Sequence, residues 1–425
     1  MSIDNQFIMR QAANVAGYIT RRGGQQFLKL DESLAGTADK LAAEAAGSEA
    51  SLYIHIPFCR TLCPFCCFNR YPLDEAKAKR YFINLKREVQ MYADRGFTFN
   101  DFYFGGGTPT CVMDGLEDFV AFLRSIFEVK RISLESTPRE INPENIRRLQ
   151  AIGVSRLSIG VQSFDDEVLK ATGRATMDGA ESRKKLTLAQ GQFQTVNADI
   201  IFNFPAQSLE SFRKDITIFK ELGIDQATFY PLMPSPHKMN ALEKRFNRVD
   251  TSRELEFYNI ILRELYDQGY EAATAWCFSR GAHMIDEYII DYDDYVGVGA
   301  GSVGLLRGNF LVNTFSLEKY DELINENRLP VMLGKKLAER DNLRYYMLTK
   351  LFGMTLDPTR FEARFGGGIN HKLGLEMAFF RTLGLVSNNG KIEVTRRGMY
   401  PVSVMMKEFF AALNGLREYC IEGKI

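Results

Sequence analysis

The sequence predicts an α/β protein, with a partial (β/α)6 barrel of the TIM type followed by a helical, winged-helix-like C-terminal domain. The first observation is a repeated alternation of short apolar segments and amphipathic segments between residues 51 and 235. Such alternation is typical of parallel strands joined by right-handed helical crossovers. About six of these units can be counted, whereas a complete barrel needs eight. The 425 residues also suit one barrel-sized domain and a smaller second one.

The expected strands are short and apolar on both faces, as in parallel sheets that are covered by helices. They span residues 51–56, 101–104, 131–135, 156–162, 195–202 and 226–232. Helical spacing of apolar residues predicts the connecting helices. These helices span residues 75–95, 115–129, 143–152, 178–190 and 209–222. Two of them stop at glycines, Gly153 and Gly223, which are typical helix-ending residues.

The expected organisation has four parts. They are a helical N-terminal segment at 1–50, the barrel core at 51–235, a barrel extension and substrate-side region at 236–334, and an accessory domain at 335–425. In the first part, Arg21-Arg22-Gly23-Gly24 are expected to break a helix over 5–20, and the Ala-rich stretch 35–46 predicts another helix. In the third part, we expect a long helix at 252–268 and a Gly- and Asp-rich loop at 291–303.

The accessory domain combines helices with a small hairpin, which is the winged-helix-like pattern. Its expected elements are helices at 338–351, 357–365, 371–383 and 400–413 and a hairpin at 385–394. Asn388-Asn389-Gly390 supplies the turn of the hairpin. In a chain without a basic excess, we expect this domain to act as a lid or support rather than to read DNA.

Composition excludes several classes of protein. The chain has 53 Lys and Arg against 53 Asp and Glu, a balance that argues against a nucleic-acid-binding surface. Seven cysteines in so long a chain argue against a disulfide-stapled secreted scaffold. No export signal or apolar run of membrane-spanning length is apparent, so we expect a cytoplasmic protein without a membrane partner.

Four of the seven cysteines fall close together, directly after the first expected strand. They are Cys59, Cys63, Cys66 and Cys67. The C-x3-C-x2-C spacing lacks the second cysteine pair or the paired histidines of a structural zinc site. Three thiolates from one short loop suit an iron–sulfur cluster whose fourth iron stays open to another ligand. Unconnected buried thiols are the alternative.

The cysteine loop and a glycine run after the second expected strand together resemble the pattern of the radical S-adenosylmethionine (SAM) superfamily. The run is Gly105-Gly106-Gly107-Thr108-Pro109. The resemblance implies a 4Fe-4S cluster held by Cys59, Cys63 and Cys66, with the amine and carboxylate of SAM on the open iron. Reduction by a donor such as flavodoxin or ferredoxin would then give a 5′-deoxyadenosyl radical.

Two further stretches are similar to the oxygen-independent coproporphyrinogen III oxidase group. They are Tyr53-Ile54-His55-Ile56-Pro57-Phe58-Cys59 and Ile159-Gly160-Val161-Gln162-Ser163-Phe164. The resemblance implies that Tyr53 lies near the cluster and sulfonium and that Phe65 contacts the adenine. It further implies contacts to SAM from Gly106, Gly107, Thr108, Glu135, Gln162, Arg174 and Asp199. Tyr53 and Glu135 are the residues for which a catalytic role is expected.

The sequence also departs from that group. Phe68 stands where the oxidase has a further cysteine, and Cys66-Cys67-Phe68-Asn69 looks more like the haem chaperones and the anaerobic haem-degrading methyltransferases. The chaperones' His-Asn-x-x-Tyr-Trp stretch is missing from residues 285–290, before the Asp294-Tyr295-Val296-Gly297 motif. The segment 276–280 and the Gly-rich segment 297–304 resemble the haem-degrading branch. Asn203 replaces the glycine of the usual Gly-Leu-Pro.

The sequence therefore predicts a radical SAM enzyme that acts on a tetrapyrrole-like or other unsaturated small molecule, in the manner of coproporphyrinogen III oxidase. Radical C-methylation with two SAM molecules is an alternative, and a haem-binding chaperone or carrier is an alternative of another class. His55 is equally consistent with a core position and a site near the cluster. His237 and His283 are weaker candidates for the substrate region. Cys111, Cys277 and Cys420 are expected to be buried free thiols.

Overall fold

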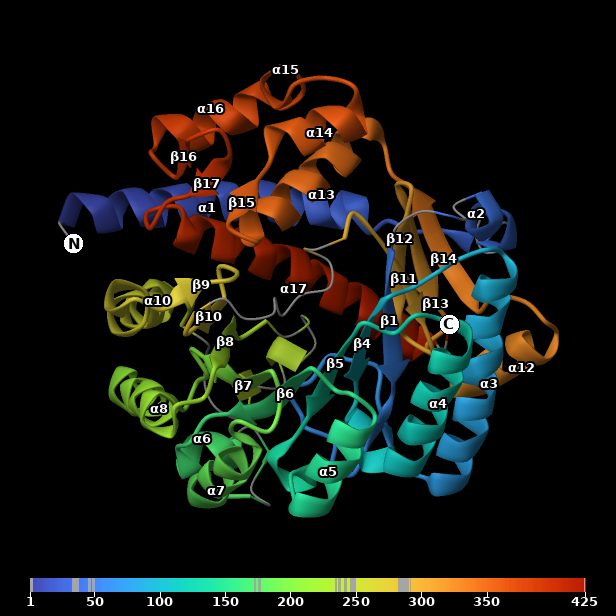
Figure 1. Ribbon diagram of the computed structural model, residues 1–425. Helices are drawn as coiled ribbons and strands as arrows, with labels where there is room; N and C mark the ends of the chain where they lie inside the picture. Colours follow the sequence, from blue (N-terminus) through green and yellow to red (C-terminus); the bar gives the residue numbers. More distant parts are fainter. Residues whose placement is uncertain are drawn as a thin grey trace.

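The core of the computed structural model is a curved parallel sheet (Figure 1). The structure describes residues 3–32, 38–44, 47, 50–171, 173–174, 177–233, 235, 238–240, 243–244, 250–281, 290, 292–423 and 425. All six expected strands are present: β1 (Ala50–Ile56), β4 (Asp101–Gly106), β5 (Arg131–Ser136), β6 (Arg156–Gln162), β7 (Thr195–Phe202) and β8 (Gln226–Pro231). Each pairs in parallel with the next, which confirms the predicted barrel order.

Helices follow these strands and cover the outside of the sheet (Figure 1). They are α3 (Glu75–Asp94), α4 (Met113–Ile126), α5 (Pro143–Ala151), α6 (Asp166–Ala171), α7 (Gly179–Ala189) and α8 (Leu209–Leu222). Local sequence sets the ends of α8, because Ser208 and Ser211 form a reciprocal capping box. Gly223 ends the helix with a φ of 64°, as its position in the sequence predicted.

The sheet extends beyond the six core strands on both sides. The added strands are β9 (Glu271–Ala272), β10 (Cys277–Ser279), β11 (Asp294–Val298), β12 (Val303–Leu306), β13 (Asn309–Asn313) and β14 (Val331–Lys336). Within the described residues the full order is β14-β13-β12-β11-β1-β4-β5-β6-β7-β8-β10-β9. β11 pairs in parallel with β1, whereas the other added strands pair antiparallel.

The expected loop at 291–303 is therefore wrong, because most of this range is strand β11 and its turn into β12. The glycines there serve close packing rather than flexibility. A Cβ on Gly297 would lie 2.2 Å from the carbonyl oxygen of Val303, so only glycine lets the two strands approach this closely.

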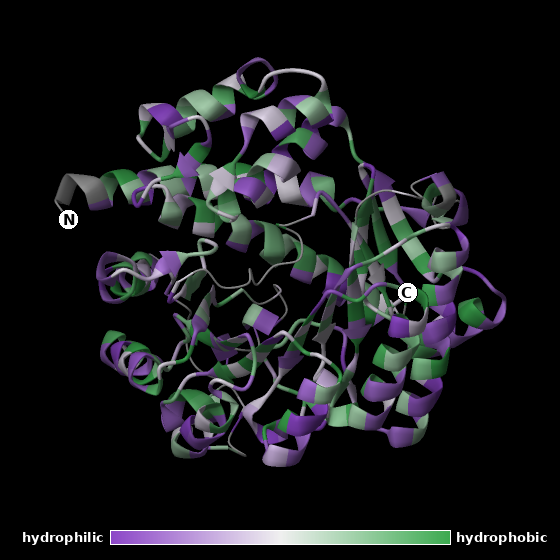
Figure 2. Cartoon of the chain, viewed as in Figure 1, coloured by the Kyte–Doolittle hydropathy of each residue, from purple (hydrophilic) through white to green (hydrophobic). Residues whose placement is uncertain are grey.

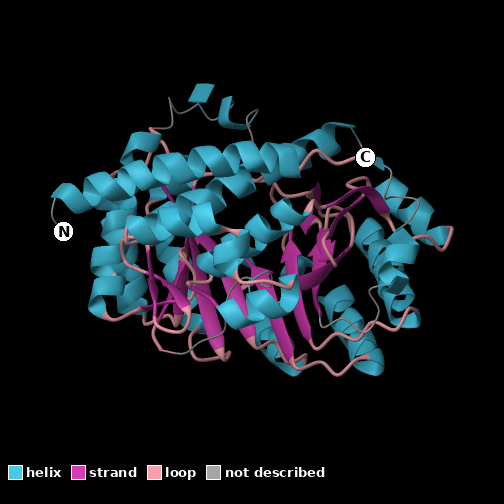
Figure 3. Ribbon diagram, turned by 90° about the horizontal axis from the view of Figure 1, so that it is seen from above, coloured by secondary structure: helices cyan, strands magenta, loops and turns pink. Residues whose placement is uncertain are grey.

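The expected helix break at Arg21–Gly24 is also wrong. Helix α1 (Ile3–Phe27) continues through it and runs alongside α17 (Met399–Gly423) (Figures 1 and 3). The small residues let the two helices approach, since a Cβ on Gly24 would lie 3.3 Å from the Cβ of Ala412. Arg21 donates to the carboxylate of Glu408 at 2.7 Å and joins the helices further. Helix packing thus outweighs the low helix propensity of glycine.

The remaining elements surround the sheet. They are α2 (Ala38–Glu44), β2 (Phe58–Cys59), β3 (Tyr71–Pro72), α10 (Glu254–Glu264), α12 (Leu317–Asn325), α13 (Glu339–Phe352), β15 (Thr355–Leu356), α14 (Pro358–Phe365), α15 (Ile369–Lys372), α16 (Gly374–Thr382), β16 (Val386–Asn388) and β17 (Ile392–Val394). The C-terminal region is helical with a small hairpin, as predicted. Its last helix, however, continues to Gly423 and not only to about residue 413.

One continuous hydrophobic cluster runs from Met9 on α1 to Cys420 on α17 and includes the buried faces of the parallel strands. In Figure 2 the apolar residues follow the strands and the facing sides of the helices. The cluster connects all four parts proposed from the sequence, whose boundaries stay predictions. Within the described chain, no helix is both long and apolar enough to cross a membrane.

Candidate functional site

A cavity of about 360 Å³ opens at the carboxyl ends of the parallel strands. This edge is where barrels place their sites, because the loops after successive strands converge there. All twelve site residues predicted from the sequence line this one cavity. They are Tyr53, Cys59, Cys63, Phe65, Cys66, Gly106, Gly107, Thr108, Glu135, Gln162, Arg174 and Asp199. The structure thus brings together residues that are distributed over five strands and their loops.

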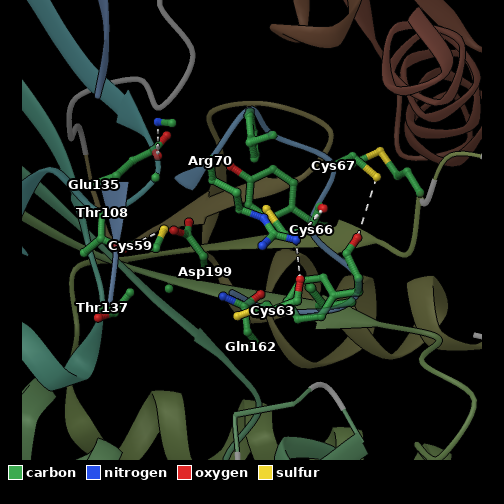
Figure 4. Close-up of a pocket in the computed structure, with 18 of the residues that line it drawn as sticks. Cys59, Cys63, Cys66, Cys67, Arg70, Thr108, Glu135, Thr137, Gln162 and Asp199 are labelled. Atoms are coloured by element: carbon green, nitrogen blue, oxygen red, sulfur yellow. Dashed lines mark hydrogen bonds between the residues drawn. The ribbon is translucent and has the colours of Figure 1, made fainter. Parts of the chain in front are cut away.

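The cysteine loop has a defined shape. Figure 4 shows the side chains of Cys59, Cys63 and Cys66 arranged around one pocket. Arg70 donates to the backbone carbonyls of Cys63 and Cys66, the second at 3.0 Å. The Cys59 thiol lies 3.6 Å from the hydroxyl of Thr108, which ties the loop to the glycine run. These contacts fix the backbone of the loop at Cys63 and Cys66 and the thiol of Cys59.

The three thiols fit an iron–sulfur cluster, in which three irons each take one thiolate. Among the described residues, no group of three His, Cys, Asp or Glu side chains could hold one metal ion. The thiols line a common cavity, and in a cubane cluster each iron takes its own thiolate. Burial raises the pKa of Cys59 to about 11, so this thiol ionises when a cation such as iron compensates the charge.

The glycine run lies against the cysteine-bearing strand. A Cβ on Gly107 would lie 2.5 Å from the carbonyl oxygen of Phe58, and no larger residue fits between these backbones. Gly106 has a φ of 107°, and its N–H donates to the carboxylate of Glu135 at 3.1 Å. Tyr103 donates to the other oxygen of Glu135 at 3.0 Å. Glu135 is thereby held beside the backbone that faces the cavity.

The ends of β6 and β7 form the opposite wall. Gln162 has a φ of 72°, and the β6–β7 register shifts between Gly160 and Gln162. Left-handed backbone at a non-glycine residue costs about 1–3 kcal/mol and is typical of functional sites. Arg174 donates to the carbonyl of Gly160, and its buried Nε has no hydrogen-bond partner among the described residues. This open donor at the cavity indicates a polar ligand.

Asp199 is fixed within the sheet. Its carboxylate accepts from the hydroxyl of Ser158 at 2.9 Å and from the amide of Asn197 at 2.7 Å. These bonds hold the carboxylate at one place on the cavity wall, which Figure 4 shows beside the cysteine loop.

Tyr53 and His55 form a buried pair at the end of β1. The hydroxyl of Tyr53 and Nδ1 of His55 lie 3.0 Å apart, and Nε2 of His55 lies 2.9 Å from the carbonyl oxygen of Asn69. Burial lowers the pKa of His55 to about 4, so the ring is neutral. A neutral ring that donates from Nε2 to Asn69 accepts from Tyr53 at Nδ1. His55 is thus a core histidine that positions a lining residue.

Asn203 shows how the chain accommodates a departure from its relatives. The residue has a φ of 62°, a left-handed conformation. Asparagine adopts it more readily than other non-glycine residues, and it stands where the resembled group has glycine. The left-handed turn after β7 is therefore compatible with asparagine at this position.

Sequence reasoning missed one wall of the cavity, which comes from α17. Its lining residues are Phe409, Phe410, Leu413, Asn414 and Arg417. Their spacing places them on one helical face, but no motif connects that face with the barrel. His237 and His283 lie outside the described residues. The described chain includes all seven cysteines, and none forms a disulfide.

Residues 53–238 match the model of the Radical SAM superfamily. The chain carries a radical SAM domain. Curated relatives of this chain include the heme chaperone HemW of Bacillus subtilis, which is 25% identical over 86% of this chain and 99% of the relative. The oxygen-independent coproporphyrinogen III oxidase of Helicobacter pylori is 27% identical over 86% of both chains. The anaerobilin synthase of Escherichia coli O157:H7 is 28% identical over 73% of both.

The solved structure of coproporphyrinogen III oxidase (HemN) from Escherichia coli shares the fold of this chain. The TM-score is 0.75, and the match covers 90% of this chain and 95% of that one at 24% identity. The superfamily and the oxidase relatives indicate an enzyme. The cofactors of the radical SAM family are a 4Fe-4S cluster and SAM, and the three cavity thiols fit the first of them.

Proposed function

We propose that this radical SAM enzyme holds its cluster through Cys59, Cys63 and Cys66 and acts on a tetrapyrrole by hydrogen abstraction. The observation that carries the proposal is the convergence of the twelve predicted residues on one cavity. Relatives named coproporphyrinogen III oxidase, heme chaperone and anaerobilin synthase support a tetrapyrrole as the ligand. When bound, the reduced cluster supplies the electron that cleaves SAM.

The chain's own residues would bind and orient SAM in this cavity. The backbone of Gly106 and Gly107 allows close approach of the methionine part, and the open Nε of Arg174 offers a donor to a polar group. Phe65 packs edge-on against Phe204, with ring centroids 6.4 Å apart, and so presents a fixed apolar face for the adenine. Tyr53 is held by His55 near the thiols.

Water exclusion is the second task of the chain, because a carbon radical must be kept from side reactions. The far wall of the cavity is apolar and aromatic, with Trp276, Tyr230, Phe409 and Phe410 among its lining residues. Trp276 is held by a hydrogen bond from its indole N–H to Ser403 at 2.8 Å. A planar apolar ring system would fit against such a wall.

Radical methyl transfer is the second candidate. It is favoured by Phe68, which stands where the oxidase group has a further cysteine, and by the Trp276–Arg280 segment that resembles the haem-degrading branch. The same cavity would then take a second SAM beside the substrate. A haem carrier would use the cavity without SAM cleavage.

One experiment separates these functions. The full chain is reconstituted anaerobically with iron and sulfide and incubated with SAM, a flavodoxin or chemical reductant, and coproporphyrinogen III or haem. 5′-Deoxyadenosine without S-adenosylhomocysteine supports hydrogen abstraction, whereas both products together support methyl transfer. Haem binding without either product supports the carrier. Failure of every tetrapyrrole to bind or react would overturn the proposed substrate class.

A further inference from the structure

Arg417 is a buried cation on the part of α17 that lines the cavity. Only 9% of the residue is exposed to solvent. Its guanidinium carbon lies 4.5 Å from the ring centroid of Phe68, in the cysteine loop. The side chain is therefore placed at the junction of the C-terminal helix and the loop that carries the predicted cluster ligands.

The position of Arg417 is held from both sides. Nη1 donates to the side-chain oxygen of Asn414 at 2.9 Å, and Asn414 in turn donates to the carbonyl of Met233 at 2.6 Å. Met233 follows β8, so this chain of contacts connects α17 with the end of the sheet. Stacking on Phe68 and the bond to Asn414 together restrict the guanidinium to one orientation.

No acidic side chain of the described residues pairs with Arg417, and its Nε and Nη2 donate to none of them. Three other arginines that line the cavity each have a partner, although the buried Nε of Arg70 and that of Arg174 have none among the described residues. Arg60 pairs with Glu140 at 2.9 Å, and Arg70 and Arg174 donate to backbone carbonyls. A buried cation without a counter-charge is costly, and the usual solution is an anionic partner.

We propose that Arg417 is the centre of a carboxylate-binding subsite formed by Arg417, Asn414 and Phe68. A guanidinium with two open donors recognises a carboxylate through paired hydrogen bonds. Phe410 and Leu413 lie on the same helix face and line the same cavity, so the carboxylate would be carried by an apolar body. The choice of substrate, a tetrapyrrole with carboxylate side chains, rests on the proposed function. The carboxylate of a SAM molecule is the other source of the same chemistry.

The test uses Trp276, the single tryptophan of the chain, which lines the same cavity. Binding of coproporphyrin III to the reconstituted full-length protein is followed by quenching of its fluorescence. Arg417→Met is expected to weaken binding about ten- to hundredfold, as for a lost charged hydrogen bond. Arg417→Lys should recover part of the affinity. The tetramethyl ester of coproporphyrin III, which has no carboxylate, should bind both proteins alike. Arg147→Met, on the exposed face of α5, is the matched control for charge.

Two further measurements identify the source and keep the two proposals separate. If Arg417→Met raises the KM for SAM and leaves porphyrin binding unchanged, the subsite holds a SAM carboxylate. Sodium propionate, compared with sodium chloride at equal ionic strength, should raise the Tm of the wild type and not that of Arg417→Met. This result is independent of any porphyrin, so it still supports the subsite if the tetrapyrrole proposal fails. Equal behaviour of wild type and Arg417→Met toward coproporphyrin III, SAM and propionate would overturn the subsite.

Discussion

The hydroxyl of Tyr53 lies 3.0 Å from Nδ1 of His55, and both residues project from β1 toward the cysteine loop. This bond and the bond from His55 to Asn69 fix the tyrosine ring at the edge of the cavity. The histidine therefore positions a lining residue and holds the end of the loop at the same time.

Replacing His55 by Phe takes one hydrogen-bond partner from each of two buried polar groups, the Tyr53 hydroxyl and the Asn69 carbonyl. Each such group costs about 1–3 kcal/mol, so we expect a clear loss in the free energy of unfolding. Tyr53→Phe removes only the hydroxyl and should cost less. Both are measured by denaturant unfolding. SAM cleavage should decrease in His55→Phe as it does in Tyr53→Phe, and full cleavage activity in His55→Phe would contradict the positioning role.

Cys63→Ala should abolish cluster assembly, because three separate thiolates are needed for three irons. The measurement is iron and sulfide content with the charge-transfer absorbance of the reconstituted protein. Cys67 is a matched control, since its thiol accepts from the N–H of Ser235 at 3.4 Å and lies in the same loop. Cys67→Ala should keep the cluster. A Cys63→Ala protein with full iron content would contradict the assignment of ligands.

Gly107→Ala and Gly415→Ala should change stability in opposite directions. At Gly107 a Cβ meets the Phe58 carbonyl oxygen at 2.5 Å, and neither backbone can move without disturbing the cysteine loop. We expect a loss of at least about 3 kcal/mol in the free energy of unfolding. At Gly415 on α17 nothing lies within 4 Å of an added Cβ, so alanine should stabilise the protein by about 0.5–1 kcal/mol. Denaturant titration of both variants checks the signs.

Glu88 should make stability depend on pH. Burial raises the pKa of this carboxyl to about 7, although it accepts hydrogen bonds from Gly299, Tyr320 and Asn313. Between the usual glutamate pKa and about 7, the folded state holds a proton that the unfolded state has released. The contribution of Glu88 to stability therefore decreases as pH rises through this range and is constant above it.

Glu88→Gln cannot ionise and should lack this part of the pH dependence, because its amide takes the place of the protonated carboxyl. The difference between the two unfolding curves is followed from pH 5 to pH 8. A wild-type stability that rises relative to Glu88→Gln over this range would contradict the buried neutral carboxyl.

The six strands of the core could be predicted because each is a short apolar run followed by an amphipathic helix, a pattern that depends on local sequence alone. β11 was missed because Gly297 and Gly299 resemble loop residues, whereas their role is close approach to Val303 and to His55. The same reason applies to Gly24 in α1, which is small because α17 lies against it. Such glycines are explained by a neighbour that is distant in sequence.

The cavity was predictable where motifs mark it, as at Cys59 and Gly106, and not where a remote helix completes it. Arg417 follows the cysteine loop by some 350 residues, and a lone arginine on an amphipathic helix is usually a surface residue. Its burial becomes apparent only when α17 is seen between α1 and the sheet (Figure 1).

The late position of α17 in the chain has a consequence for assembly. The strands and the cysteine loop belong to residues 50–231 and carry their own hydrogen bonds, including those from Arg70 to the loop. None of these hydrogen bonds comes from α17, so we expect the three thiols to stay accessible to solvent until α17 docks. We therefore expect iron and sulfide to reach the cysteine loop before α17 closes the cavity. A protein arrested before α17 docks would hold its cluster in a cavity that is open to solvent.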